Sequence, residues 1–166
     1  MGLLSRFWRQ PCRPYRNFQL VFTALKLNFM APAVSYALFP EVAVAQYVRA
    51  NQILGGAAYP FNELDSHFWR ILAAANVMTL GFMCLLLQVN VRRFFPVLWP
   101  LVFMKALAAL LWLGHAAARP DIPVFWGAGL LDVLTSGLFV VFAGRAHRAG
   151  ATYAPQDLCP RPYPRP

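Results

Sequence analysis

Two side chains of opposite charge lie in the middle of neighbouring apolar runs, and they are the residues best placed for chemistry. Lys105 is near the centre of the run Pro96–Ala118, and Asp132 is near the centre of the run Pro123–Ala143. The connection Arg119–Ile122 is short, so helices formed by the two runs would be antiparallel neighbours with both charges at similar depth. An isolated Lys or Asp at the centre of a bilayer costs about 3 kcal/mol on insertion scales. We therefore expect Lys105 and Asp132 to face each other or a shared polar cavity.

Further polar residues are expected at the same depth, and together they make a candidate midplane site. Lys26 and Asn76 lie near the centres of two other apolar runs, and Thr135 and Ser136 share a helix face with Asp132. In a functional interpretation, Asp132 accepts and the lysines donate hydrogen bonds to a ligand, a proton or a quinone headgroup. In a structural interpretation, an internal ion pair with additional hydrogen bonds fixes the register of the helices. The sequence leaves both interpretations open.

A second candidate group lies at the outer ends of the apolar runs. It consists of His67, Arg70, His115 and Asp121, with Glu41 as a further candidate. In a functional interpretation, the two histidines are axial ligands of a haem or chlorin, or belong to a metal site. In a structural interpretation, they are interfacial residues that bond to headgroups, water or loop backbone. We expect no metal site, because no carboxylate follows them at the spacing of known metal motifs. The sequence also lacks the GxSxG, phosphate-loop, HExxH and CxxC motifs. It therefore identifies no catalytic residue.

The elements that carry these residues are predicted to be four transmembrane helices, because each run approaches the roughly 20 residues needed to cross a bilayer. Hydrophobic residues make up 59% of the chain. Charged residues make up only 13%, whereas soluble domains contain roughly 25% charged residues. The fold class is therefore an all-α integral membrane four-helix bundle. We expect a basic, aromatic interfacial segment over 1–17, a four-helix domain over 18–144 and a Pro/Arg-rich extended tail over 145–166. The four predicted spans are 18–39, 67–89, 96–118 and 123–143.

The arginines predict how the bundle is oriented. Ten arginines lie on the two tails and on the loop between spans two and three, and three lie on the other connections. The positive-inside rule therefore places both termini on the cytoplasmic side, with the connection Pro40–Ser66 outside. That connection is apolar enough at its start for a short surface helix, which Gly55 and Gly56 would end. Nucleic acid is not expected as a partner, although the net charge is +9, because the arginines flank the apolar runs.

The three cysteines, Cys12, Cys84 and Cys159, are scattered along the chain and are expected to be free thiols. Pro32 lies inside the first apolar run, where we expect it to kink the helix.

Four stretches of the chain resemble a broad set of small bacterial four-helix membrane proteins that are loosely similar to the DoxX-like group. They are ALFPEVA, SHFWRILAAANVMTLG, VFMKALAALLWL and GLLDVLTSGLFVVFAGR. The resemblance spans roughly Phe39–Arg145. The pattern of that set is an Asp-Pro-Phe-Trp-like start of span two, a Gly-Lys in span three and an Asp in span four. The corresponding residues here are Asp65–Trp69, Lys105 after Met104, and Asp132. Lys26 and the basic tails depart from the pattern.

The resemblance implies the four-helix fold, its topology and a location in the bacterial inner membrane. Some members of the set accompany membrane oxidoreductase systems. We therefore predict a non-catalytic accessory or assembly subunit of a larger membrane complex, respiratory or photosynthetic, that contacts lipids and other subunits. The alternatives are a small enzyme that binds a lipid or quinone at the midplane site, and a transporter that oligomerises. A bound lipid, quinone or pigment is compatible with each of them.

Overall fold

The computed structural model describes residues 12–57 and 63–152, and most of these residues lie in helices. The all-α prediction is confirmed for these ranges, because they contain no strand. The predicted extended tails lie largely outside the described residues. The elements are α2 (Arg13–Leu38), α3 (Pro40–Ile53), α4 (Glu63–Val89), the 3-10 turn η1 (Phe95–Val97), α5 (Leu98–Ala118) and α6 (Val124–Thr152).

The four long helices are long and apolar enough to cross a membrane, as the sequence predicts. Within their most apolar windows, only 17–28% of the residues are buried inside the bundle. Large apolar side chains such as Leu110, Leu111 and Phe103 are 64–70% exposed. Continuous apolar surfaces of this extent are not found on soluble monomers. The composition and burial of the helices therefore indicate a multi-pass membrane protein.

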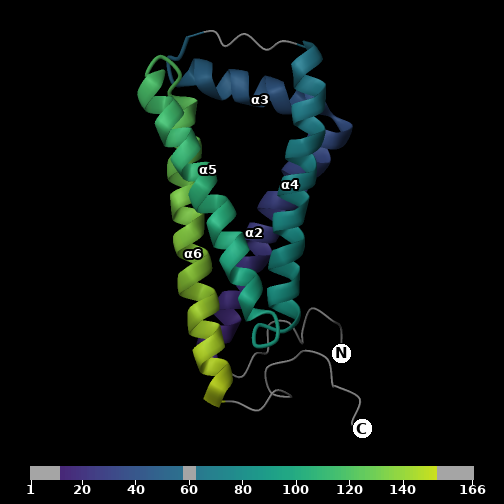
Figure 1. The fold of residues 1–166 in the computed structure, drawn as a ribbon, viewed down its shortest axis with the longest axis vertical. Coiled ribbons are helices and arrows are strands. Elements are labelled where there is room, and N and C mark those ends of the chain that lie inside the picture. The colour runs from purple at the N-terminus through teal and green to yellow at the C-terminus, as the bar shows by residue number, and fades with distance from the viewer. Residues whose placement is uncertain (1–11, 58–62, 153–166) are drawn as a thin grey trace.

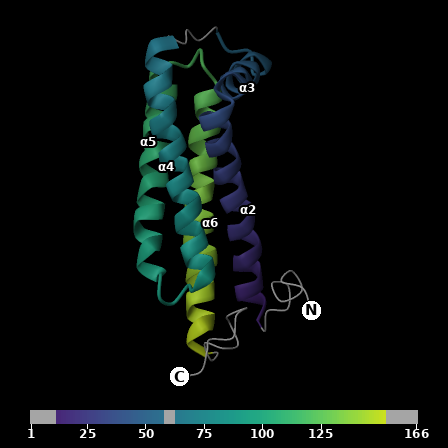
Figure 2. The same cartoon turned by 90° about the vertical axis from the view of Figure 1, so that its right-hand side faces the viewer.

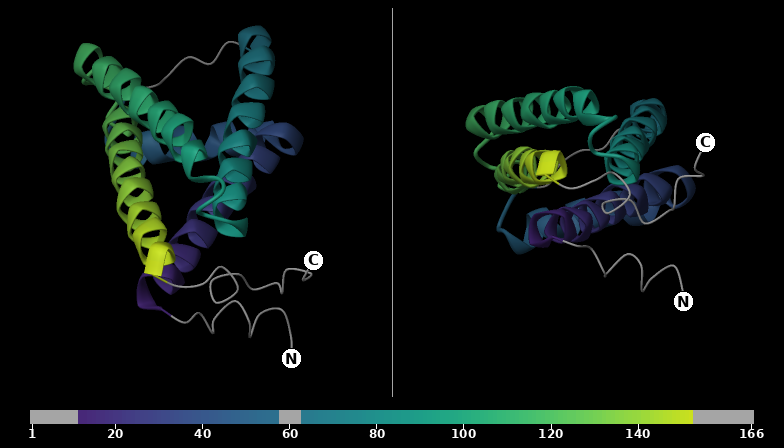
Figure 3. Two further views of the ribbon diagram at one scale, coloured as in Figure 1. Left: turned by 60° about the horizontal axis from the view of Figure 1, so that its bottom comes forward. Right: turned by 90° about the horizontal axis from the view of Figure 1, so that it is seen from below.

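The helices form two packed pairs that are joined at one side. α2 packs along α4, α5 packs along α6, and α2 also contacts α6 (Figures 1 and 2). α4 and α5 meet near η1 and then diverge, so that they form the two arms of a V (Figures 1 and 3). α3 lies across the open end of this V (Figures 1 and 2). We call this end of the bundle the α3 end.

The core lies toward the opposite end, where α2 begins and α6 finishes. Its centre is a row of aromatic rings in which Phe22 is 4.4 Å from Phe18 and 5.5 Å from Phe139, measured between ring centroids. Ala143 and Ala146 of α6 are fully buried in the same cluster. The sequence predicted that this helix would end at residue 143, but it continues to Thr152. The added turns place Ala146 in the same buried cluster as Tyr15 and Phe18 of α2.

A buried pair of glutamines fastens α2 to α4 close to this core. The side-chain amide of Gln19 donates to the Gln88 carbonyl at 3.0 Å, and the amide of Gln88 donates to the Gln19 carbonyl at 3.1 Å. Gln88 also donates to Thr23 Oγ1 at 2.8 Å. Buried amide groups that bond across a helix pair restrict the two helices to one register.

The α3 end is closed by a turn whose conformation requires glycine. α3 ends at Ile53, and Gly55 adopts a φ of +76°, which confirms the prediction that the glycine pair ends this helix. Asn51 Nδ2 then donates to the Ala57 carbonyl at 2.8 Å, and the Ala57 N–H donates to the Asp121 carbonyl at 2.8 Å. The turn is thereby attached to the connection between α5 and α6.

Candidate functional site

Lys105 of α5 and Asp132 of α6 form an ion pair near the middle of the bundle. The prediction that the two side chains face each other is confirmed. Their side chains are 15% and 10% exposed, respectively. The two helices approach closely beside the pair, because a Cβ atom on Gly129 would lie 2.7 Å from the Leu113 side chain and 3.3 Å from the Leu113 backbone nitrogen.

The aromatic ring of Phe29 brings α2 into the same contact. Lys105 Nζ lies 5.0 Å from the centroid of this ring, within the range of a cation–π interaction. Phe29 is 3% exposed and packs against Phe139 of α6, with ring centroids 6.0 Å apart. The Lys105 ammonium is therefore held between a carboxylate on α6 and an aromatic face on α2.

The hydroxyl groups predicted to join this site bond to their own helix instead. Thr135 Oγ1 donates to the Leu131 carbonyl at 2.7 Å, and Ser136 Oγ donates to the Asp132 backbone carbonyl at 2.9 Å. Such bonds to the carbonyl four residues earlier are the usual choice of a hydroxyl inside a helix. Thr135 and Ser136 therefore do not extend the ion pair into a larger polar network.

Lys26 and Asn76 depart further from the predicted midplane group. Lys26 is half-buried on α2, and the ion pairs among the described residues do not include it. Asn76 is exposed on α4, so the prediction that it joins the group is wrong. The reason is which face of α4 packs against α2. α4 approaches α2 at Gly81, where a Cβ atom would lie 2.9 Å from Met30 Cγ. Asn76 lies on an exposed face of α4.

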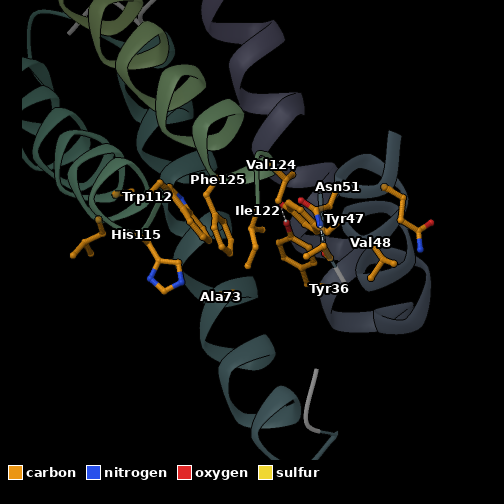
Figure 4. A pocket seen from close by; sticks show the side chains of 14 residues that line it. Tyr36, Tyr47, Val48, Asn51, Ala73, Trp112, His115, Ile122, Val124 and Phe125 are labelled. Atoms are coloured by element: carbon orange, nitrogen blue, oxygen red, sulfur yellow. Dashed lines mark hydrogen bonds between the residues drawn. The ribbon is translucent and has the colours of Figure 1, made fainter. Parts of the chain in front are cut away.

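A cavity of about 820 Å³ lies at the α3 end and was not predicted from the sequence. Side chains of α2, α3, α4, α5 and α6 line it, and most of its surface is apolar (Figure 4). Its polar groups include Tyr36 and Tyr47, whose hydroxyl oxygens are 2.7 Å apart. Trp112 and Phe125 stack in its wall with ring centroids 5.3 Å apart and planes 20° apart. Part of the signal was visible in the sequence, because Trp112 and His115 are one turn apart on a helix.

His115 lines this cavity and meets the Phe125 ring edge-on, with centroids 4.9 Å apart. Its predicted companions His67 and Arg70 fall in the first turns of α4, where the structure does not describe the side chains. The joint coordination of a cofactor by the two histidines thus stays a prediction. Within the described ranges, no three His, Cys, Asp or Glu side chains gather closely enough to hold a metal ion. Cys12 and Cys84 are free, as predicted, and Cys159 lies outside the described residues.

No protein-family model matches the sequence, and neither a curated protein nor a solved structure is significantly similar to it. The resemblance to the DoxX-like group therefore stays a hypothesis that rests on its short motifs. Arguments about function have to start from the ion pair, the cavity and the exposed surfaces.

Proposed function

We propose that this chain is a multi-pass protein of the bacterial inner membrane and a non-catalytic accessory or assembly subunit of a larger membrane complex. The observation that carries the proposal is the exposure of Asn76 in the middle of an apolar helix. Among the described residues, none hydrogen-bonds the side chain of Asn76. Moving an amide from water into hydrocarbon without a partner costs roughly 4–8 kcal/mol. A helix of another subunit that supplies a polar partner removes this cost.

The central ion pair supports the same proposal. Asp132 is paired with Lys105, whose ammonium also faces Phe29, and the nearby hydroxyls are bonded to their own helix. These contacts satisfy the polar groups by bonds within the chain, as expected for a pair that sets helix register. Whether the complex is respiratory or photosynthetic stays a prediction from the resemblance.

The substitution Asn76→Leu tests the role of the exposed amide. We expect the variant to insert normally but to retain less of its partner on a native gel of gently solubilised membranes. An interhelical hydrogen bond in a membrane contributes about 1 kcal/mol, so the dissociation constant should rise about fivefold. Met78→Leu is the matched control, because Met78 is also exposed on α4 and lies on another side of the helix.

Two results would contradict the proposal. The first is a wild-type chain that migrates alone or only as a homo-oligomer. The second is a complex whose amount and stability are the same with Asn76→Leu as with Met78→Leu.

Labelling of introduced cysteines tests the proposed orientation. The arginine distribution supports cytoplasmic termini, so a cysteine placed at Asn62 should react with a membrane-impermeant maleimide in intact cells. Cys159 should react only after the membrane is opened. Reaction of Cys159 in intact cells would reverse the orientation.

A further inference from the structure

We propose that the cavity at the α3 end binds a quinone-type amphiphile, with a neutral planar ring, oxygen atoms at two opposite edges and an apolar tail. The proposal does not depend on the accessory role, because it rests on the cavity and not on Asn76. The cavity volume of about 820 Å³ lies in the range of roughly 300–1,000 Å³ that is typical of small-molecule sites. Ala73 of α4 and Ala108 of α5 line it from the two diverging arms, and these small side chains leave room for a ligand between the arms.

The lining favours a neutral ligand. Of the described residues that line the cavity, none is Lys, Arg, Asp or Glu. A phosphate or carboxylate headgroup would therefore lose its hydration without gaining a counter-ion, which is strongly unfavourable in an apolar site. Phospholipids and fatty acids consequently fit the cavity less well than a neutral amphiphile does.

Hydrogen-bond donors face the cavity from two sides. Between the Tyr36 and Tyr47 hydroxyls, one hydrogen is used in their mutual bond and the other can be donated to a ligand. His115 lies across the cavity from this pair, and a neutral imidazole also carries one N–H donor (Figure 4). A ligand that uses both sides needs an acceptor oxygen at each of two opposite edges.

The wall between these donors suits a planar ring. The stacked rings of Trp112 and Phe125 lie between His115 and the tyrosine pair (Figure 4). Aromatic faces gain additional attraction from offset stacking with another ring. A benzoquinone headgroup combines the planar ring, the two opposed carbonyl oxygens and the absence of charge. Its alkyl or isoprenoid tail would occupy the apolar part of the cavity.

Fluorescence of Trp112 tests the proposal on the full chain in phosphatidylcholine nanodiscs. The probe is decylbenzoquinone, whose ring quenches tryptophan on contact. We expect quenching that saturates at a low quinone-to-lipid ratio. Quenching that rises linearly with quinone content would show contact only from the surrounding lipid and would overturn the proposal. Trp112 is made the sole reporter by replacing the remaining tryptophans with phenylalanine, at Trp8, Trp69, Trp99 and Trp126.

Two variants of α4 locate the binding site. Ala73→Phe fills the cavity and should abolish the saturable quenching. Ala75→Phe adds the same side chain on the exposed surface of that helix and should leave the quenching unchanged. Equal loss in both variants, or no loss in either, would refute binding in the cavity.

Conservative changes at the donors test recognition of the ring without filling the cavity. The double change Tyr36→Phe with Tyr47→Phe removes both hydroxyls of the tyrosine pair, and His115→Leu removes the imidazole donor. Each of these two variants should raise the half-saturating quinone concentration about tenfold, the factor expected for one lost hydrogen bond. Sodium decanoate, which has a similar tail and a negative charge, should not compete. Competition by decanoate, or unchanged half-saturation in both variants, would reduce the cavity to a general site for alkyl chains and overturn the proposal.

Discussion

Removing one partner of the Lys105–Asp132 pair should destabilise the protein more than removing both. Breaking one side of a buried ion pair costs about 3–5 kcal/mol, and the partial exposure of both side chains favours the lower end of that range. Asp132→Leu leaves the Lys105 ammonium over the Phe29 ring, which retains about 0.5–2 kcal/mol of cation–π attraction. Lys105→Met leaves an Asp132 carboxylate that has no other ion-pair partner among the described residues. Lys105→Met should therefore be the more damaging single change.

The double variant Lys105→Met with Asp132→Leu carries no uncompensated charge. Replacement of a buried pair by apolar side chains of similar volume is often neutral or stabilising. We therefore expect the double variant to lose less stability than either single variant, with a coupling energy of about 3 kcal/mol. The free energy of unfolding can be measured by far-UV circular dichroism during titration of mixed micelles with a denaturing detergent.

An exposed pair provides the matched control for this cycle. Arg119 Nη2 and Asp121 Oδ2 are 2.8 Å apart, with side chains 49% and 43% exposed. The guanidinium group, mainly through its hydrogen bond, lowers the pKa of Asp121 below the usual aspartate value. Exposed pairs nevertheless contribute little to stability, so this second cycle should show no measurable coupling. Additive losses for Lys105 and Asp132, without rescue in the double variant, would refute the ion-pair reasoning.

Three further substitutions test the packing around the pair and the core. Gly129→Ala should cost about 1–3 kcal/mol, because the new Cβ would lie 2.7 Å from the Leu113 side chain. Gly137→Ala is the control, because nothing lies within 4 Å of a Cβ atom at this position. It should stabilise the helix by up to about 1 kcal/mol. Equal effects of the two alanines on thermal unfolding would contradict the close approach of α5 and α6 at Gly129. Gln88→Leu should cost about 1–3 kcal/mol, the sum for two hydrogen bonds, because it removes the bonds to the Gln19 backbone carbonyl and to Thr23 Oγ1. An unchanged unfolding midpoint would show that these bonds are not stabilising.

The features that could be predicted from the sequence depend on local geometry. The short connection between the last two apolar runs forces α5 and α6 to be antiparallel, and this brings Lys105 opposite Asp132. The end of α3 at Gly55 follows in the same way from the conformational freedom of glycine. Each of these inferences needs only residues that are close to one another in the sequence.

The features that could not be predicted depend on how distant helices turn toward one another. The depth of Asn76 in its span is readable from sequence, but the face it occupies relative to α2 is decided by the contact of Gly81 with Met30. The cavity likewise needs α3 to lie across the bundle, so that Tyr47 meets Tyr36. Periodicity alone does not contain this information, because nearly every face of these helices is apolar.

The ion pair and the cavity are linked through the position of α5. Lys105 lies one turn from Ala108, which lines the cavity, and it holds α5 against α6. α5 packs along α6 and diverges from α4 toward the α3 end (Figure 1). The polar centre thus has a structural consequence even without a ligand of its own, since it keeps open the space in which we place the quinone. If this is correct, the stable double variant should bind decylbenzoquinone more weakly than the wild type, although neither substituted residue lines the cavity.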